Sequence, residues 1–111
     1  MEISNTQYKR CDVVNAIGRI DSASAPQLHD AFNTLVEENR FHIVFNMNEV
    51  SFISSAGLRV LISTQKNCKR FNRGELVLTE IPENIQAALD LAGFTSLFTI
   101  FESEVAAVGH F

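Results

Sequence analysis

A strand pattern, a loop of small residues and a helix pattern follow one another over residues 41–62, and this unit constrains the fold most. Residues 41–47 are apolar and β-prone, and they alternate in the manner of a strand. The two faces of that strand are Ile43, Phe45 and Met47 on one side and His42, Val44 and Asn46 on the other. Beyond the loop, an apolar stripe at helical spacing consists of Leu58, Leu61, Ile62, Gln65 and Cys68. Such a unit is typical of α/β folds.

Small residues, Ser54 to Gly57, occupy the predicted start of the helix. The first four backbone N–H groups of a helix lack partners, and a serine oxygen can accept a hydrogen bond from one of them. The same end of a helix carries partial positive charge, which favours an anion. The residues alone therefore leave two roles open: Ser54 or Ser55 caps the helix, or one of them is a place where a phosphate is tolerated.

The rest of the chain continues the alternation of strands and helices. We expect further strands at residues 2–10, 12–20, 75–79 and 97–101. Helix patterns follow Pro26, run from the serine loop to about Phe71, extend from Pro82 to Gly93, and end the chain through Val108. The first two strands are close enough for a hairpin, whereas the others need right-handed crossovers. The sequence therefore predicts one α/β domain over residues 1–111, with a mixed, mostly parallel sheet of four to five strands and crossover helices.

Several residues at the predicted helix ends are expected to begin, cap or end a helix. Ser24 is expected to cap the first helix, with Pro26 in its first turn. Gly74 is expected to end the second helix with a positive φ. Basic side chains gather at the end of that helix: Lys66, Lys69, Arg70 and Arg73. They suit the helix dipole there, and a basic docking patch is the alternative interpretation.

Composition excludes several classes of protein. A hydrophobic fraction of 46% in 111 residues is enough for a core, and Cys11 and Cys68 indicate thiols in a reducing compartment. The net charge of −4, without a basic block, argues against nucleic acid or an anionic membrane as a partner. No signal peptide and no apolar run of membrane-spanning length occurs. We therefore expect a cytoplasmic protein.

The sequence offers no catalytic grouping. Neither Ser54 nor Ser55 lies in a Gly-x-Ser-x-Gly motif, and His29, His42 and His110 have no spacing that would recruit one as a base. No set of histidine, cysteine and carboxylate residues has metal-ligand spacing, and the glycines do not form a phosphate loop. We predict a protein that is not an enzyme and that has no cofactor or metal.

The segment Phe52-Ile-Ser-Ser-Ala-Gly-Leu-Arg59, after a strand ending in Asn46, resembles the STAS domain, and the free-standing anti-sigma factor antagonists most. In that family a partner kinase phosphorylates a serine in this loop, which a small residue and a glycine follow. The resemblance places that serine at Ser55, the small residue at Ala56 and the glycine at Gly57. Many members have an aspartate before the serine. Here that position is Ser54, which makes Ser54 a second candidate for phosphorylation.

The resemblance also implies a partner-binding surface, because the stretch from Asp21 to Pro26 matches a family loop that lies beside the serine loop. The implied partner-binding residues are Asp21, Ser22, Ser24, Phe52, Ile53, Ser54, Ser55, Ala56, Gly57 and Arg59. We expect at least one of Phe52 and Ile53 to be exposed there. We expect Gly57 to allow close approach of a partner, so that Gly57→Leu would weaken binding and leave thermal stability nearly unchanged.

The function implied by the resemblance is that of an anti-sigma factor antagonist, monomeric when free. It would bind a serine-kinase anti-sigma factor, be released when Ser55 is phosphorylated, and be restored by a serine phosphatase. The alternative is a STAS scaffold or binding module in another bacterial partner-switching pathway, such as secretion, motility or second-messenger control, without a sigma-factor target.

Overall fold

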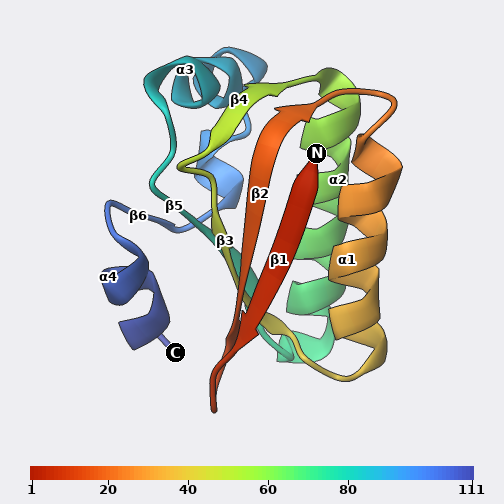
Figure 1. Cartoon of the computed structure of the whole chain (residues 1–111). Coiled ribbons are helices and arrows are strands. Elements are labelled where there is room, and N and C mark those ends of the chain that lie inside the picture. Colours follow the sequence, from red (N-terminus) through yellow and green to blue (C-terminus); the bar gives the residue numbers. More distant parts are fainter.

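The computed structural model describes all 111 residues, in which strands and helices alternate along most of the chain (Figure 1). The strands are β1 (Glu2–Gln7), β2 (Asp12–Ile20), β3 (His42–Asn46), β4 (Val50–Ile53), β5 (Glu75–Thr79) and β6 (Ile100–Phe101). The helices are α1 (Ala25–Glu37), α2 (Ser55–Lys69), α3 (Glu83–Ala92) and α4 (Glu104–Gly109). Two short 3-10 turns lie at Arg70–Asn72 and Thr95–Leu97. The predicted α/β fold is therefore confirmed.

The sheet has the order β1-β2-β3-β5-β6, and β4 pairs with the second half of β2. The β1–β2 pair is an antiparallel hairpin, as predicted, and all other pairs are parallel. Two parallel neighbours thus divide β2 between them: β3 pairs with residues 12–15 and β4 with residues 18–20. This division lets β4 lead directly into α2 at one end of the sheet.

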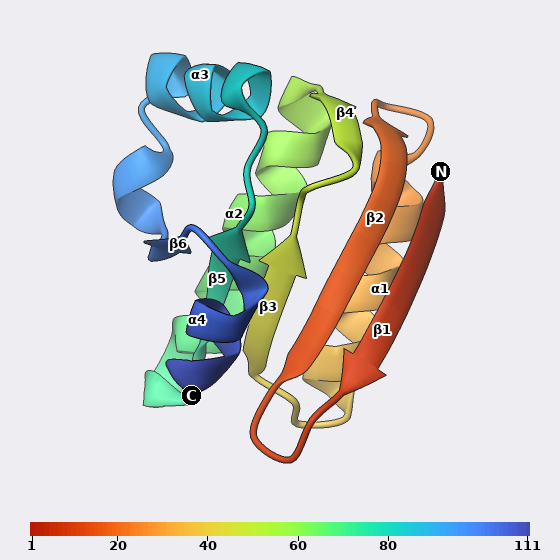
Figure 2. The same cartoon turned by 60° about the vertical axis from the view of Figure 1, so that its left-hand side comes forward.

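Helices cover both faces of the sheet (Figure 2). α1 and α2 lie side by side on one face, where the larger hydrophobic cluster includes Leu28, Phe32, Phe45 and Leu61. α4 lies on the opposite face, and its Ala107 packs in a second cluster, which also contains Cys11, Val13, Val44 and Val77. α3 lies at the β4 end of the sheet, where Asn84 donates a hydrogen bond to the Ser51 carbonyl oxygen (3.1 Å).

β3 departs from the alternation expected between a buried and a less buried face. Ile43, Val44 and Phe45 are all fully buried, and Asn46 is only 8% exposed. The physical reason is that α4 covers the second face of the sheet, so Val44 is buried in the cluster around Ala107. A central strand of a two-sided sheet is expected to be apolar on both faces.

Four expected boundaries were wrong. The first strand ends at Gln7 rather than at residue 10, and residues 50–53 form β4 rather than part of a loop. The last strand contains only Ile100 and Phe101, because residues 95–97 form a turn. α2 ends at Lys69 rather than near Phe71. Phe71 itself has a φ of 58°, so the chain turns there in a left-handed conformation.

Gly74 was expected at a positive φ, and this prediction was wrong. The glycines with positive φ are Gly18 and Gly93, of which Gly93 ends α3 as predicted. At Gly74 a Cβ atom would lie 2.3 Å from the carbonyl oxygen of Phe41. Glycine is required here because two backbone segments, at the starts of β3 and β5, approach each other closely.

Gln65 is a buried polar residue within the apolar stripe of α2, with 5% exposure. Its Nε2 donates to the carbonyl oxygens of Leu76 (3.0 Å) and Leu97 (2.9 Å), and its Oε1 accepts from the Leu76 amide (2.7 Å). The amide of one side chain therefore holds α2, β5 and the turn at residues 95–97 together. The sequence pattern did not predict this role.

Candidate functional site

The end of β2 and the short strand β4 position the start of α2. Ile20 pairs with Ile53, and both side chains are buried in the main core. The register shifts between Gly18 and Arg19, and Gly18 has a φ of 111°, a conformation that favours glycine. The register after this bulge places Arg19 opposite Phe52.

Ser54 is the N-cap residue of α2. Its hydroxyl oxygen accepts a hydrogen bond from the Gly57 amide (3.2 Å), and its carbonyl oxygen accepts one from the Leu58 amide (2.9 Å). Its own amide donates to the Ile20 carbonyl oxygen (2.8 Å), which ties the start of α2 to the end of β2. The half-buried Ser54 is thus held by both sheet and helix, and of the two candidate serines it is the one that caps the helix.

Ser55 is exposed and is the first residue of α2. The backbone amides of Ser55 and Ala56 donate to no other group of the chain, and the first turn contains no acidic side chain. Two free donors and the positive end of the helix dipole therefore lie beside an exposed hydroxyl group. Such an arrangement favours an anion.

Gly57 is buried, and its expected role in admitting a partner needs correction. A Cβ atom at this position would lie 2.7 Å from both Ile20 Cγ2 and Ile53 Cγ1. Carbon atoms in optimal contact are about 3.5–4.0 Å apart. The glycine therefore permits close packing of α2 on β2 and β4 within the chain itself.

The loop from Asp21 to Ser24 connects β2 to α1 and is stabilised by its own side chains. The Asp21 carboxylate accepts hydrogen bonds from the amides of Ala23 and Ser24, both at 3.0 Å. The Ser24 amide is the main reason that the pKa of the Asp21 carboxyl is lowered. The Ser24 hydroxyl donates to the Arg19 carbonyl oxygen (2.7 Å) and accepts from the Asp21 amide (2.9 Å).

The expected capping bond of Ser24 was therefore wrong. Ser24 does stand at the N-cap position of α1, with Pro26 in the first turn as predicted. Its hydroxyl, however, forms no capping hydrogen bond with the helix, because it is already engaged with Asp21 and Arg19. Ser24 stabilises the loop that precedes α1 instead of the helix end.

Phe52 confirms the expectation of an exposed apolar residue beside the loops, since it is 37% exposed whereas Ile53 is only 5% exposed. The Arg19 guanidinium carbon lies 4.3 Å from the centroid of the Phe52 ring, a cation–π contact. Arg59, one turn after Ser55 on α2, is also exposed. We call the exposed residues at this end of the sheet the α2-entry surface: Arg19, Ser22, Ala23, Phe52, Ser55 and Arg59.

The ten partner-binding residues that the resemblance implies differ in their exposure to solvent. Ser22, Phe52, Ser55 and Arg59 are exposed, Asp21, Ser24, Ser54 and Ala56 are half-buried, and Ile53 and Gly57 are buried. Sequence reasoning missed Arg19 on this surface. Its contact with Phe52 depends on the pairing of β4 with β2, and residues 50–53 carry no strand signal strong enough to predict that pairing.

None of the three histidines belongs to the α2-entry surface. His42 Nδ1 donates a hydrogen bond to the Arg10 carbonyl oxygen (3.0 Å), His110 pairs with Glu75, and His29 is exposed on α1. No group of three or more histidine, cysteine, aspartate or glutamate side chains is arranged to hold a metal ion. None of the helices combines the length and the apolar character needed to cross a membrane.

The chain is similar in sequence to known proteins. The STAS domain model matches residues 2–107. Among curated proteins, BtrV of Bordetella bronchiseptica, named as a candidate anti-sigma factor antagonist, is 33% identical over 94 residues, which are 85% of this chain and 80% of BtrV.

Solved structures share the fold. An anti-sigma factor antagonist from Mycobacterium paratuberculosis superposes with a TM-score of 0.88 at 21% identity, over 98% of this chain and 92% of that one. The Bacillus cell fate determinant SpoIIAA in its phosphorylated form superposes with a TM-score of 0.76 at 14% identity, over 98% of each chain.

Proposed function

This chain belongs to the STAS domain family, and on that premise we propose that it is an anti-sigma factor antagonist switched by phosphorylation of Ser55. In this proposal the unphosphorylated protein binds a serine-kinase anti-sigma factor in the cytoplasm through the α2-entry surface. The kinase phosphorylates Ser55 and the complex dissociates, and a serine phosphatase restores the binding form. The protein acts by binding and not by catalysis, and it is a monomer when free.

The observation that carries the proposal is the position of Ser55. Its hydroxyl is exposed at the first turn of α2, whereas the Ser54 hydroxyl is half-buried and accepts a hydrogen bond from Gly57. A kinase can reach the first group without breaking any hydrogen bond within the chain. We therefore assign the phosphate to Ser55 and the capping role to Ser54.

The fold is expected to tolerate this phosphate. A phosphoserine carries about −1.5 to −2 charges at neutral pH, and a helix N-terminus stabilises a negative charge by about 0.3–1 kcal/mol. The free amides of Ser55 and Ala56 can donate to it, and no acidic side chain of the first turn repels it. SpoIIAA, which has the same fold, is known in a phosphorylated form.

Binding is expected to be far more sensitive to the phosphate than folding is. A partner that covers the α2-entry surface must remove water from Phe52 and from the neighbouring Ser55. Burying an unpaired charge costs several kcal/mol, whereas regulatory couplings are typically about 1–3 kcal/mol. The free-energy cost of burying a phosphate at Ser55 therefore exceeds the coupling free energy that is needed to release the partner.

The experiment is a capture of partners from the lysate of the source bacterium, read by quantitative mass spectrometry. We expect wild type and Ser55→Ala to retain a serine-kinase anti-sigma factor and Ser55→Asp to lose it. Incubation of the captured kinase with ATP and the wild-type protein should place phosphate on Ser55. Ser54→Ala should still accept it.

A matched control is Ser63→Asp, which introduces the same charge at an exposed serine two turns further along α2. It should leave capture unchanged. Phosphate found on Ser54 alone, or equal capture by wild type and Ser55→Asp, would contradict the assignment. Capture of a phosphorylation-dependent partner unrelated to sigma factors would replace the proposal with the scaffold function in another partner-switching pathway.

A further inference from the structure

A second surface lies at the other end of α2, between the last turns of that helix and the turn at Thr95–Leu97. It is a groove of about 490 Å³. We call it the α2-exit groove, and the residues that matter for its chemistry are Ile62, Gln65, Lys66, Lys69, Arg70 and Leu97. The groove lines α2 from Ile62 to Arg70, so it begins about two turns, or about 10 Å at the usual helical rise, beyond Ser55.

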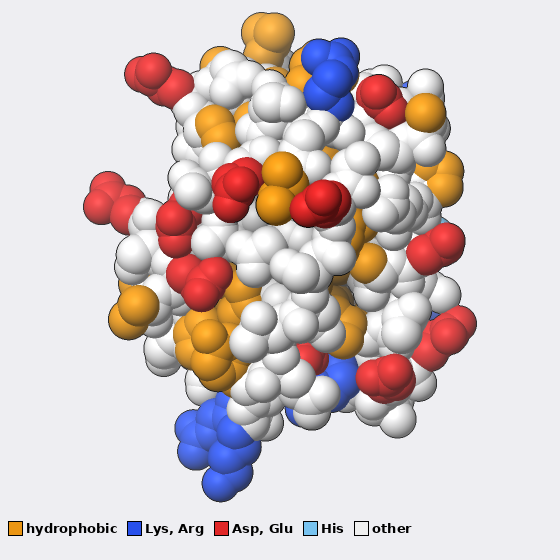
Figure 3. Space-filling model, in the orientation of Figure 1, with side chains coloured by type: hydrophobic (Ala, Val, Ile, Leu, Met, Phe, Trp, Pro, Cys, Tyr) orange, Lys and Arg blue, Asp and Glu red, His pale blue; other side chains and the backbone are white.

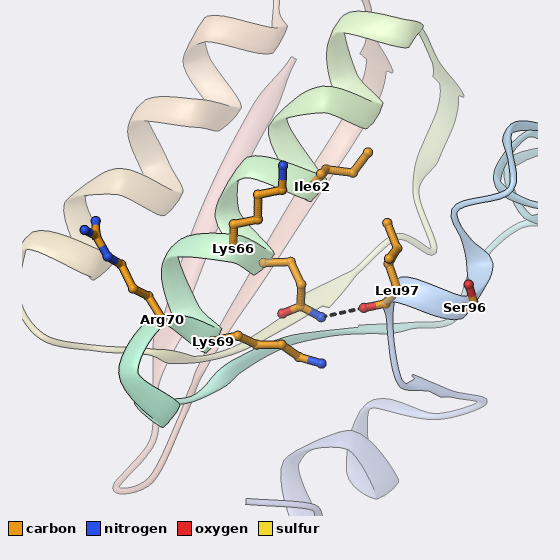
Figure 4. A pocket seen from close by; sticks show the side chains of 7 residues that line it. Ile62, Lys66, Lys69, Arg70, Ser96 and Leu97 are labelled. Atoms are coloured by element: carbon orange, nitrogen blue, oxygen red, sulfur yellow. Dashed lines mark hydrogen bonds between the residues drawn. The ribbon is translucent and has the colours of Figure 1, made fainter.

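The groove combines apolar and basic side chains. Ile62 is half-buried and Leu97 is 43% exposed, and they line the groove from its two walls. Figure 4 shows Lys69 extending from α2 toward the wall formed by Leu97, whereas the Arg70 guanidinium points away from that wall. The hydrogen bond from Gln65 to the Leu97 carbonyl oxygen (2.9 Å), a dashed line in Figure 4, joins the two walls.

The basic side chains of the groove have no acidic partner in the chain. The salt-bridge contacts of the protein are Arg40 with Asp12 and, whenever the histidine is protonated, His110 with Glu75, so Lys66, Lys69 and Arg70 take part in neither. Three of nine basic residues thus stand together and unpaired in a chain of net charge −4. Elsewhere, the face seen in Figure 3 carries many separate acidic side chains, with basic ones gathered mainly at the tip of the β1–β2 hairpin.

An exposed and strained aromatic residue adjoins the groove. Phe71 is 79% exposed and has a φ of 58°, a conformation rare for a bulky side chain. The Arg70 guanidinium carbon lies 5.1 Å from its ring centroid. Left-handed backbone at a bulky residue costs free energy. Exposed aromatic and arginine side chains are typical anchors of protein interfaces.

We propose that the α2-exit groove binds an acidic segment of a partner protein, in which an apolar side chain is flanked by aspartate or glutamate. The apolar side chain lies against Ile62 and Leu97, and the carboxylates pair with Lys66 and Lys69. Phe71 and Arg70 extend the contact beyond the groove. This site is independent of the proposed switch at Ser55, so a partner can bind here whether or not Ser55 is phosphorylated.

Charge and apolar character favour such a segment over a nucleic acid. A nucleic acid would present many phosphates to a chain of net charge −4, in which only three cations line this groove. The exposed apolar area of Leu97 and Phe71 would gain nothing from a phosphate backbone. A short acidic peptide uses the cations and the apolar side chains together.

The test uses a short fluorescein-labelled peptide in which leucine alternates with glutamate, titrated with the whole chain and followed by fluorescence anisotropy. We expect saturable binding that weakens at high salt and that is absent for a peptide with lysine in place of glutamate. Lys66→Glu combined with Lys69→Glu should weaken binding by about tenfold or more. Amide chemical shifts in ¹H–¹⁵N spectra should change around Ile62 and Leu97.

The matched control reverses two charges at the hairpin tip instead, with Lys9→Glu and Arg10→Glu, and should bind as the wild type does. Ser55→Asp should also bind as the wild type does, which separates this proposal from the one above. Equal weakening by both charge reversals, or shift changes centred on Ser55, would overturn the site. A dimer in sedimentation that the Lys66 and Lys69 reversals abolish, or tighter binding of single-stranded DNA than of the peptide, would overturn the choice of occupant.

Discussion

Replacing Gly57 by alanine tests the packing that places α2 against the sheet. The new Cβ atom would lie 2.7 Å from Ile20 Cγ2 and from Ile53 Cγ1, about 1 Å inside the optimal separation of carbon atoms. Neither contact is with the far end of a flexible side chain, and both isoleucines are buried in the main core. The methyl group therefore cannot be accommodated without movement of the core.

The magnitude follows from two opposing contributions. Overpacking a core typically costs about 1–3 kcal/mol, whereas alanine in a helix is favoured over glycine by about 1 kcal/mol. Because two contacts are each about 1 Å too short, we expect the overpacking cost to lie near the upper end of its range, about 2–3 kcal/mol, so that Gly57→Ala lowers the free energy of unfolding by about 1–2 kcal/mol in all. In a domain of 111 residues this corresponds to a decrease in Tm of about 4–10 °C. Gly57→Leu should be more destabilising still, contrary to the expectation from the sequence.

Urea denaturation followed by circular dichroism measures the effect, with Gly109→Ala as the matched control. A Cβ atom at Gly109, also in a helix, would meet nothing within 4 Å, so this variant should be neutral or slightly stabilising. Ile53→Ala removes one of the two clashing side chains, so the double variant with Gly57→Ala should be less destabilised than the sum of the single variants by about 1 kcal/mol. A Gly57→Ala protein as stable as the wild type would refute the packing argument.

Three other predictions concern stability and pH. Ser54→Ala should remove the N-cap of α2 and lower the free energy of unfolding, measured by urea denaturation, by about 1 kcal/mol. The control Ser63→Ala, at an exposed position in the same helix, should change that free energy by less than about 0.5 kcal/mol. Gln65→Leu should leave the buried Leu76 amide without a hydrogen-bond partner and lower the free energy of unfolding by about 1–3 kcal/mol. Hydrogen exchange of the Leu76 amide should become faster. Unchanged exchange would contradict the role assigned to the Gln65 side chain. The pKa of Asp21 is lowered in the folded protein, so the ionised carboxylate stabilises the fold at pH values above the ordinary carboxyl pKa, and this contribution is lost as the pH falls through the lowered value. Carboxyl ¹³C titration should show the low pKa of Asp21. Asp21→Asn should remove this part of the acid sensitivity.

Long apolar runs with clear ends were predictable from the sequence. Residues 12–20 and 75–79 form strands with the expected bounds because apolar residues predominate in each run and turns bound it. The start of α2 was also predictable, since the Ser54 cap and the apolar stripe that follows are local signals. Local signals did not decide between Ser54 and Ser55, and Ser55 was singled out by the resemblance to the STAS domain.

Features that depend on distant residues were not predictable. β4 forms because it pairs with the end of β2, and nothing within residues 50–53 shows that pairing. The last strand is shortened because residues 95–97 form a turn, and the Leu97 carbonyl oxygen of that turn accepts a hydrogen bond from Gln65, far away in the sequence. The role of Gly57 depends on Ile20, which the fold brings to it across the sheet. In each case the feature depends on a contact with a residue that lies nearby only in the folded protein.

The hydrogen bond from Ser54 to the Ile20 carbonyl oxygen has a consequence for how Ser55 can be recognised. It anchors the serine loop to a strand of the sheet, so Ser55 is presented in a rigid helical turn and not in an extended segment. A synthetic peptide with the sequence of residues 48–62 lacks this anchor, and an isolated helix of that length is marginal in water. A kinase that phosphorylates Ser55, as proposed above, would therefore have to dock onto the folded domain, and such peptides are expected to be poor substrates for it. A search for substrates of that kinase by linear consensus sequence would then miss this protein.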